Sequence, residues 1–317
     1  MSIQRRSFLK NSSLFAGGLL FLDPIQKISR LSGKSKGMNQ TMHSVPIFHT
    51  NDLHNQLLPH KKGYGGLYNI ATVLDKENIS CLLLDAGDFL DQRASPEQHL
   101  AMIQQMNRMD YQAATIGNRE LALGQSALSE LVKKMNFPLV NCNYSFSESY
   151  LQSSVVPYHI VSWSGYRIGI TGVGTLLNRR IATTEKIVFH HPYQRANAVA
   201  AYLKKNCDFV ICLSHLGYEK NKTGYNSLDL ALASENIDLV ISGHHDDLIA
   251  APRIVRNQSK KEVILSHGGE RGLIGRHLTI GFNDQGQKNF ISCRNYVPSQ
   301  KVKEPFYEGF EKIRGVV

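Results

Sequence analysis

The sequence predicts an α/β fold in which two sheets pack in layers with helices outside them, as one domain. Two observations support this fold class. After residue 44, short apolar runs alternate with segments of helical periodicity as far as residue 242. From residue 254 to residue 296 the chain is β-rich, with turn signals between the segments. A chain of 317 residues with 42% hydrophobic content can bury one large core or two modest ones.

Seven short apolar runs predict buried strands. They cover residues 45–50, 81–86, 113–116, 139–141, 167–173, 209–213 and 239–242. Five segments between them have helical periodicity, at residues 67–76, 96–108, 126–135, 196–204 and 228–233. Residues 158–172 predict a hairpin around Ser164 and Gly165, so they do not mark a domain boundary. Turn signals at 257–261 and 283–286 divide the β-rich part, and a short amphipathic stretch follows it.

The amino terminus carries an export pattern. Residues 4–10 read QRRSFLK and precede an apolar stretch at 14–22, which together are typical of a twin-arginine signal. That stretch is far shorter than the roughly 20 residues of a membrane-spanning helix. We therefore predict an export signal and spacer at residues 1–37, no transmembrane span, and a periplasmic or otherwise exported protein. The alternative is a basic tail with a chance arginine pair.

The formal charge of +10 does not indicate a nucleic-acid surface. Residues 1–37 contain seven of the basic residues and one acidic residue, so the rest of the chain carries a net charge of only +4. We therefore expect no nucleic-acid partner. The predicted organisation is a main domain at residues 38–303, followed by a short carboxyl-terminal segment at 304–317.

Side chains of metal-ligand type follow the predicted strands at the points where they break into loops. Parallel α/β sheets bind ligands in the crevice beyond their strand ends. Oxygen ligands mixed with imidazole suit a divalent-metal centre. Each residue alone is more often a turn or loop residue, but their joint occurrence predicts a two-metal hydrolase. The candidates are Asp52 and His54 in HTNDLH, Asp88 in DAGD, Asn118 in IGNRE, His215 in SHLG and His244 in SGHHD.

Local spacing supports individual ligands. Asp52 and His54 are two residues apart on a strand-end extension, so their side chains lean the same way and can hold one ion together. Asp88 follows a strongly apolar strand and a glycine, which brings its carboxylate to the sheet edge, where it could bridge two ions. The amide oxygen of Asn118 suits a neutral ligand.

HTNDLH, GD, GN, SHLG and GH, in this order, resemble the calcineurin-like metallophosphoesterases, and HTNDLH resembles the 5′-nucleotidase branch. The resemblance covers about residues 45–298 and implies a four-layer α/β/β/α sandwich. It also implies two divalent ions (manganese, magnesium, zinc or iron), with a water between them that attacks phosphorus in line. By position, the first ion would be held by Asp52, His54 and Asp88, and the second by Asp88, Asn118, His215 and His244.

The last motif departs from the family's usual Gly-His-x-His, because it reads Gly243-His244-His245-Asp246. On an extended segment Asp246 shares a face with His244, whereas His245 points away. We therefore expect Asp246 to be the fourth ligand of the first ion, with His245 as the alternative. A carboxylate there would favour harder ions, such as manganese or magnesium, over zinc.

A second departure affects catalysis. The family's Gly-Asn-His is Gly117-Asn118-Arg119 here, and Ala122 stands where 5′-nucleotidases keep the Asp that orients that His. Arginine cannot act as a general acid near neutral pH, but it can stabilise phosphoryl charge through paired hydrogen bonds. We expect Arg119 and Asp88 to be catalytic, and activated aryl phosphates to be hydrolysed far better than alkyl phosphates.

The third departure is length. Full 5′-nucleotidases continue into a second domain that binds the base, whereas this chain stops at Val317. We expect either a small, general substrate or a separate protein that supplies that domain; Phe306, Tyr307 and Phe310 could dock it or simply pack in the core. The leading hypothesis is an exported phosphoric ester hydrolase that acts on nucleotides or related esters. The alternatives are a metal-binding pseudoenzyme or subunit needing such a partner, and a sulfur-ester hydrolase.

Overall fold

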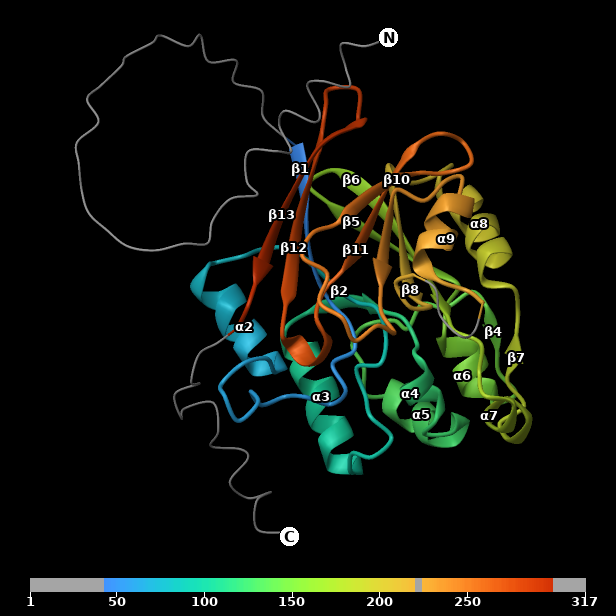
Figure 1. The fold of residues 1–317 in the computed structure, drawn as a ribbon. Coiled ribbons are helices and arrows are strands. Elements are labelled where there is room, and N and C mark those ends of the chain that lie inside the picture. The colour runs from blue at the N-terminus through green and yellow to red at the C-terminus, as the bar shows by residue number, and fades with distance from the viewer. Residues whose placement is uncertain (1–42, 220–223, 299–317) are drawn as a thin grey trace, which may run out of the picture.

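The computed structural model describes residues 43–219 and 224–298 (Figure 1). The predictions for residues 1–37 and 304–317, which include the export signal and the terminal aromatic residues, lie outside this part of the chain. Both limits of the predicted domain at 38–303 lie outside it as well, and so does most of the short amphipathic stretch.

The first sheet has five strands in the order β13-β12-β1-β2-β3. Strands β1, β2 and β3 run parallel to one another, while β12 is antiparallel to β1 and β13 is antiparallel to β12. The carboxyl ends of β1, β2 and β3 therefore lie at one edge of the sheet. The bounds are β1 His43–Thr50, β2 Leu82–Asp85, β3 Tyr111–Ala114, β12 Gly275–Phe282 and β13 Lys288–Tyr296.

The second sheet has six strands in the order β10-β11-β9-β8-β6-β5. Strands β11, β9, β8 and β6 are parallel, and the two outer strands are antiparallel to their neighbours. The bounds are β5 Tyr158–Trp163, β6 Tyr166–Gly174, β8 Phe209–His215, β9 Leu239–Ser242, β10 Arg253–Arg256 and β11 Glu262–His267. A separate pair, β4 Tyr144–Ser145 and β7 Val188–Phe189, forms a small two-stranded sheet.

Helices cover the outer face of each sheet, as Figure 1 shows. Apolar side chains of α2 (Leu67–Lys76), α3 (Pro96–Arg108) and α5 (Gln125–Val132) pack on the first sheet. Those of α8 (Pro192–Leu203) and α9 (Ser227–Ala233) pack on the second. Three shorter helices are α4 (Asn118–Leu121), α6 (Ser149–Ser154) and α7 (Arg179–Thr184). Among the described residues, no helix has the length and apolar character needed to cross a membrane.

Side chains along the central strands alternate between two cores. In β8, Phe209, Ile211 and Leu213 pack between the sheets, whereas Val210 and Cys212 pack under α8 and α9. A strand buried on both faces reads as a continuous apolar run, which is why the sequence shows no polar alternation there. These cores make four layers, so the predicted α/β/β/α sandwich is confirmed.

The structure differs from the prediction in places. The predicted strand at 113–116 lies two residues earlier, as β3, and residues 139–141 form only isolated bridges to Ala114 and Val156. The hairpin is present, and Ser164 and Gly165 both have positive φ, as a tight two-residue turn requires. Helices α4, α6 and α7 have four to six residues each. They are too short for helical periodicity to reveal them.

Candidate metal centre

The candidate ligands meet where the carboxyl ends of the two sheets face each other. Asp52 follows β1, Asp88 follows β2, His215 is the last residue of β8, and His244 follows β9. The sheets are joined directly, because the Asp52 carboxylate accepts the backbone N–H of His244 at 3.0 Å and His215 Nδ1 lies 2.8 Å from the carbonyl oxygen of Ala86.

Asp52, His54 and Asp88 form one group whose ligand atoms all lie within 4.8 Å of one another. His54 Nε2 is 3.8 Å from Asp52 Oδ1 and 3.8 Å from Asp88 Oδ2. Both carboxylates are 2% exposed, so neither is hydrated in bulk water. The structure thus brings together the three residues expected around a first ion.

Asp88, His215 and His244 form the second group within the same limit. His215 Nε2 is 3.4 Å from Asp88 Oδ2 and 3.3 Å from Asn118 Oδ1, and the rings of His215 and His244 are 5.0 Å apart. Asp88 belongs to both groups, which is the geometry required of a bridging carboxylate.

Four of these side chains depend on an unfavourable backbone. Asp52, His54, Asp88 and His244 all have φ between 48° and 61°, in the left-handed region that residues with a side chain rarely adopt. Such conformations cost about 1 to 3 kcal/mol each and concentrate at functional sites. Here all four lie in the segments that follow strands β1, β2 and β9, where the chain turns toward the site.

Glycines allow the loops to approach closely. Gly117 lies against Asp88, and a Cβ at Gly117 would overlap the Asp88 carboxylate. Gly87 has φ 90°, and a Cβ there would stand 2.8 Å from His215 Nδ1. Each glycine precedes a candidate ligand, so the ligand-bearing loops can pack without side chains between them.

Burial and the neighbouring charges set the protonation of the site. Burial raises the pKa of Asp52 to about 7, and burial lowers the pKa of His54 and of His244 to about 4. Burial alone would lower the pKa of His215, but the Asp88 carboxylate outweighs it and raises that pKa to about 10. His54 and His244 are therefore neutral, as metal binding requires. Metal binding would have to displace the His215 proton.

Glu120 supports the ligand loops and was not singled out from the sequence. Its carboxylate is fully buried and accepts the backbone N–H groups of Asp88 (3.0 Å), Leu90 (2.7 Å) and Gly117 (2.8 Å). Burial raises the pKa of this carboxyl group to about 8, while the three donors favour its ionised form. The signal in the sequence is a Glu at the third position of α4, which is the capping-box position.

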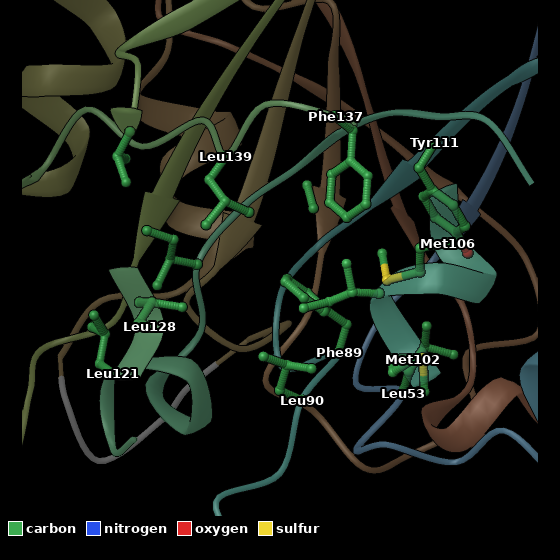
Figure 2. Close-up of a cluster of buried hydrophobic side chains, with 14 of the residues drawn as sticks. Leu53, Phe89, Leu90, Met102, Met106, Tyr111, Leu121, Leu128, Phe137 and Leu139 are labelled. Atoms are coloured by element: carbon green, nitrogen blue, oxygen red, sulfur yellow. The ribbon is translucent and has the colours of Figure 1, made fainter. Parts of the chain in front are cut away.

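The loop after β2 is also anchored by its own apolar residues. Figure 2 shows Phe89 and Leu90, which follow Asp88, among Met102 and Met106 of α3. The Phe89 ring contacts that of Phe137 edge to face, with ring centroids 6.3 Å apart. The Asp88 carboxylate, which both groups share, is therefore followed directly by residues anchored in the core.

The remaining candidates lie around these groups. Arg119 points at the centre, with Nε 3.4 Å from Asp88 Oδ2. Ala122 caps α4 at its carboxyl end and carries no polar group in its side chain. Asp246 is exposed, and it belongs to neither group. The ring of His245 packs 5.3 Å from that of buried His267. Asp246 as a ligand stays a prediction.

Comparison with known proteins shows the family to which the chain belongs. Residues 45–246 match the model of the calcineurin-like phosphoesterase family, so the chain belongs to that family. It is 27% identical over 242 residues to a 5′-nucleotidase of Vibrio cholerae, covering 69% of this chain and 43% of that protein. It is 29% identical over 227 residues to protein UshA of Yersinia enterocolitica, covering 65% and 41%. The chain thus spans less than half the length of these relatives.

Solved structures agree as well. The structure of a 5′-nucleotidase precursor from Thermus thermophilus superposes with a TM-score of 0.70 at 26% identity, covering 81% of this chain and 55% of that one. The resemblance to the 5′-nucleotidase branch, which HTNDLH indicated, is therefore confirmed in sequence and in fold.

We predict that Glu120→Gln weakens manganese binding by about 10- to 100-fold, the range typical of supporting residues. A glutamine keeps one acceptor oxygen, so an NH₂ group would face at least one of the three backbone N–H groups. Isothermal titration with manganese measures the change. Glu130→Gln, on the exposed face of α5, is the control, and unchanged affinity in Glu120→Gln would contradict the role assigned to Glu120.

Proposed function

We propose that the chain is an exported, metal-dependent phosphoric ester hydrolase of the 5′-nucleotidase type. The observation that carries the proposal is the buried Asp88 carboxylate, which two ligand groups share. Export is supported by the twin-arginine pattern in residues 1–37. A phosphoester substrate, nucleotides included, is supported by the family and by the relatives named 5′-nucleotidases.

The donor set fits two divalent ions. Two carboxylates in one buried site repel each other, and a cation is the ordinary way to hold them together. We assign Asp52, His54, Asp88 and Asp246 to the first ion and Asp88, Asn118, His215 and His244 to the second. When bound, such ions supply Lewis-acid activation of a water and of the phosphoryl oxygens.

The protein's own residues have separate tasks. Neutral His54 and His244 offer lone pairs. His215 donates from Nδ1 to the Ala86 carbonyl oxygen, which aims Nε2 at Asp88. Arg119 brings a permanent positive charge beside Asp88, where it can stabilise charge on a phosphoryl oxygen but cannot protonate a leaving group.

Two other functions remain candidates. Arg119 and Ala122 favour a metal-binding pseudoenzyme, or a subunit that needs a separate substrate-binding protein, because neither residue can donate a proton to the leaving group. A sulfur-ester hydrolase would use the same ligands on a different bond. Hydrolysis of a phosphate ester by the purified chain would separate the proposal from the pseudoenzyme. Which ester is hydrolysed, a phosphate ester or a sulfur ester, would separate it from the sulfur-ester hydrolase.

We expect manganese-dependent hydrolysis of p-nitrophenyl phosphate, its bis-ester or both by the purified chain, with turnover lost in Asp88→Ala, which removes a ligand from both groups. Asp75→Ala, at an exposed position of α2, should keep full activity. No turnover by a chain that binds two manganese ions would favour the pseudoenzyme or a missing partner. Turnover of a thiosulfate ester alone would favour the sulfur-ester alternative.

The fourth ligand of the first ion can be tested directly. Asp246→Ala should weaken binding of one of two manganese ions by at least about tenfold, whereas His245→Ala should leave both affinities close to those of the parent. Competitive titration with a fluorescent chelator gives both affinities. The reverse pattern would make His245 the ligand.

Arg119 predicts a dependence on the leaving group. Because a positioned acid is worth about 10²- to 10⁴-fold for poor leaving groups, the ratio of kcat/KM for aryl over alkyl phosphates should be large in the parent. Arg119→His should lower this ratio by at least about tenfold, and Arg108→His, at an exposed position of α3, should not. Equal turnover of both substrates by the parent would refute this account of Arg119.

A further inference from the structure

We propose that Asp91 positions the Arg119 guanidinium beside Asp88, and so supplies the orienting carboxylate that position 122 lacks. The inference rests on the proposed hydrolase function and adds a positioning residue to it. Asp91 lies in the loop after β2, three residues beyond the shared ligand, whereas Ala122 ends α4 with a methyl group.

Two anchors fix the plane of the guanidinium. Arg119 Nη1 donates to Asp91 Oδ2 at 2.7 Å, and Nε lies 3.4 Å from Asp88 Oδ2. The backbone N–H of Arg119 donates to the other oxygen of Asp88 at 2.8 Å. Within residues 43–219 and 224–298, Nη2 makes no hydrogen bond, so one edge of the fork can receive a phosphoryl oxygen.

Asp91 is also fixed by hydrogen bonds to groups other than Arg119. Its Oδ1 accepts the backbone N–H of Arg93 at 2.9 Å and Arg93 Nε at 3.0 Å, and its Oδ2, which accepts from Arg119, also accepts from Arg93 Nη2 at 2.8 Å. Its own backbone N–H donates to Asn55 Oδ1 at 3.1 Å, and its carbonyl oxygen lies 2.9 Å from His99 Nε2 on α3. The carboxylate is only 8% exposed. Asp91 is therefore already ordered by the folded loop, and this lowers the entropy cost of orienting the Arg119 guanidinium.

The ionised form of the Asp91 carboxyl group is stabilised by its neighbours. Hydrogen bonds from the side chain of Arg93 and then from its backbone N–H, with a smaller contribution from the charge of Arg119, hold the pKa of Asp91 well below its usual range. Arg93 is 71% exposed and lies on the solvent side, so it can share Asp91 without entering the centre. An ion pair with a purely structural role would make the same contacts, but its loss would leave kcat and rescue by guanidinium ion unchanged.

The first variant is Asp91→Asn, which keeps Oδ1 for the Arg93 backbone N–H but places an NH₂ group opposite Arg119 Nη1. We expect kcat for p-nitrophenyl phosphate to fall by about 10- to 100-fold, as expected for a misplaced catalytic group, with manganese affinity within about threefold of the parent. Glu130→Gln, which removes the exposed Lys133 ion pair, is the matched control and should keep parental kcat.

Chemical rescue distinguishes positioning from stability. Guanidinium ion added to Arg119→Ala should restore at least about tenfold in kcat, because Asp91 still offers a docking carboxylate. The double variant Asp91→Asn/Arg119→Ala should show no rescue. A merely structural Asp91 would leave both variants equally rescued.

An ¹⁵N NMR measurement tests the contact without turnover. In uniformly labelled protein, with Arg119→Lys to assign the signal, a held guanidinium gives a distinct, slowly exchanging Nη signal that should average out in Asp91→Asn. If this signal is present but no variant, the parent included, hydrolyses any ester, the proposed function fails while the contact stands. Parental kcat in Asp91→Asn, or loss of manganese binding there, would overturn the positioning role.

Discussion

The Asp88 carboxylate joins the two halves of the sandwich. One of its oxygens lies 3.4 Å from Nε2 of His215, at the end of a strand of the second sheet. The other accepts the backbone N–H of Arg119 in α4, which follows β3 of the first sheet. Its position depends in turn on Glu120, whose three backbone contacts fix the loop on both sides. The remaining ligands are arranged around this residue, so the site tolerates little movement at β2.

The geometry is obtained at the expense of local backbone energy. The four candidate ligands with positive φ lie in three loops, and each conformation costs about 1 to 3 kcal/mol. The surrounding core compensates, because Phe89 and Leu90 are buried immediately after Asp88. The candidate ligand at Asp88 thus lies in a strained turn whose stability comes from the apolar packing of the residues that follow it.

Much of the arrangement could be predicted from sequence. Helices α2 and α3 have the predicted bounds, because ten or more periodic residues carry a clear signal. The ligand motifs also lie at strand ends, as expected. The two residues that sequence reasoning missed, Glu120 and Asp91, make contacts between segments far apart in the sequence. Glu120 contacts Leu90 and Asp91 contacts Arg119, at separations of 30 and 28 residues. No local pattern encodes such pairs, and a carboxylate near a motif is ordinarily a surface residue.

The ligands also come from segments almost 200 residues apart, on both sheets: Asp52 belongs to the first and His244 to the second. The second candidate group takes Asp88 from the first sheet and His215 and His244 from the second. A fragment containing one sheet would lack part of that group, so binding of an ion there and closure of the sandwich would be thermodynamically linked. An ion that binds only the closed form raises the stability of the entire chain with its free concentration. Under the proposed export of the folded chain, its ions would be taken up in the compartment where the sheets first meet, before that export.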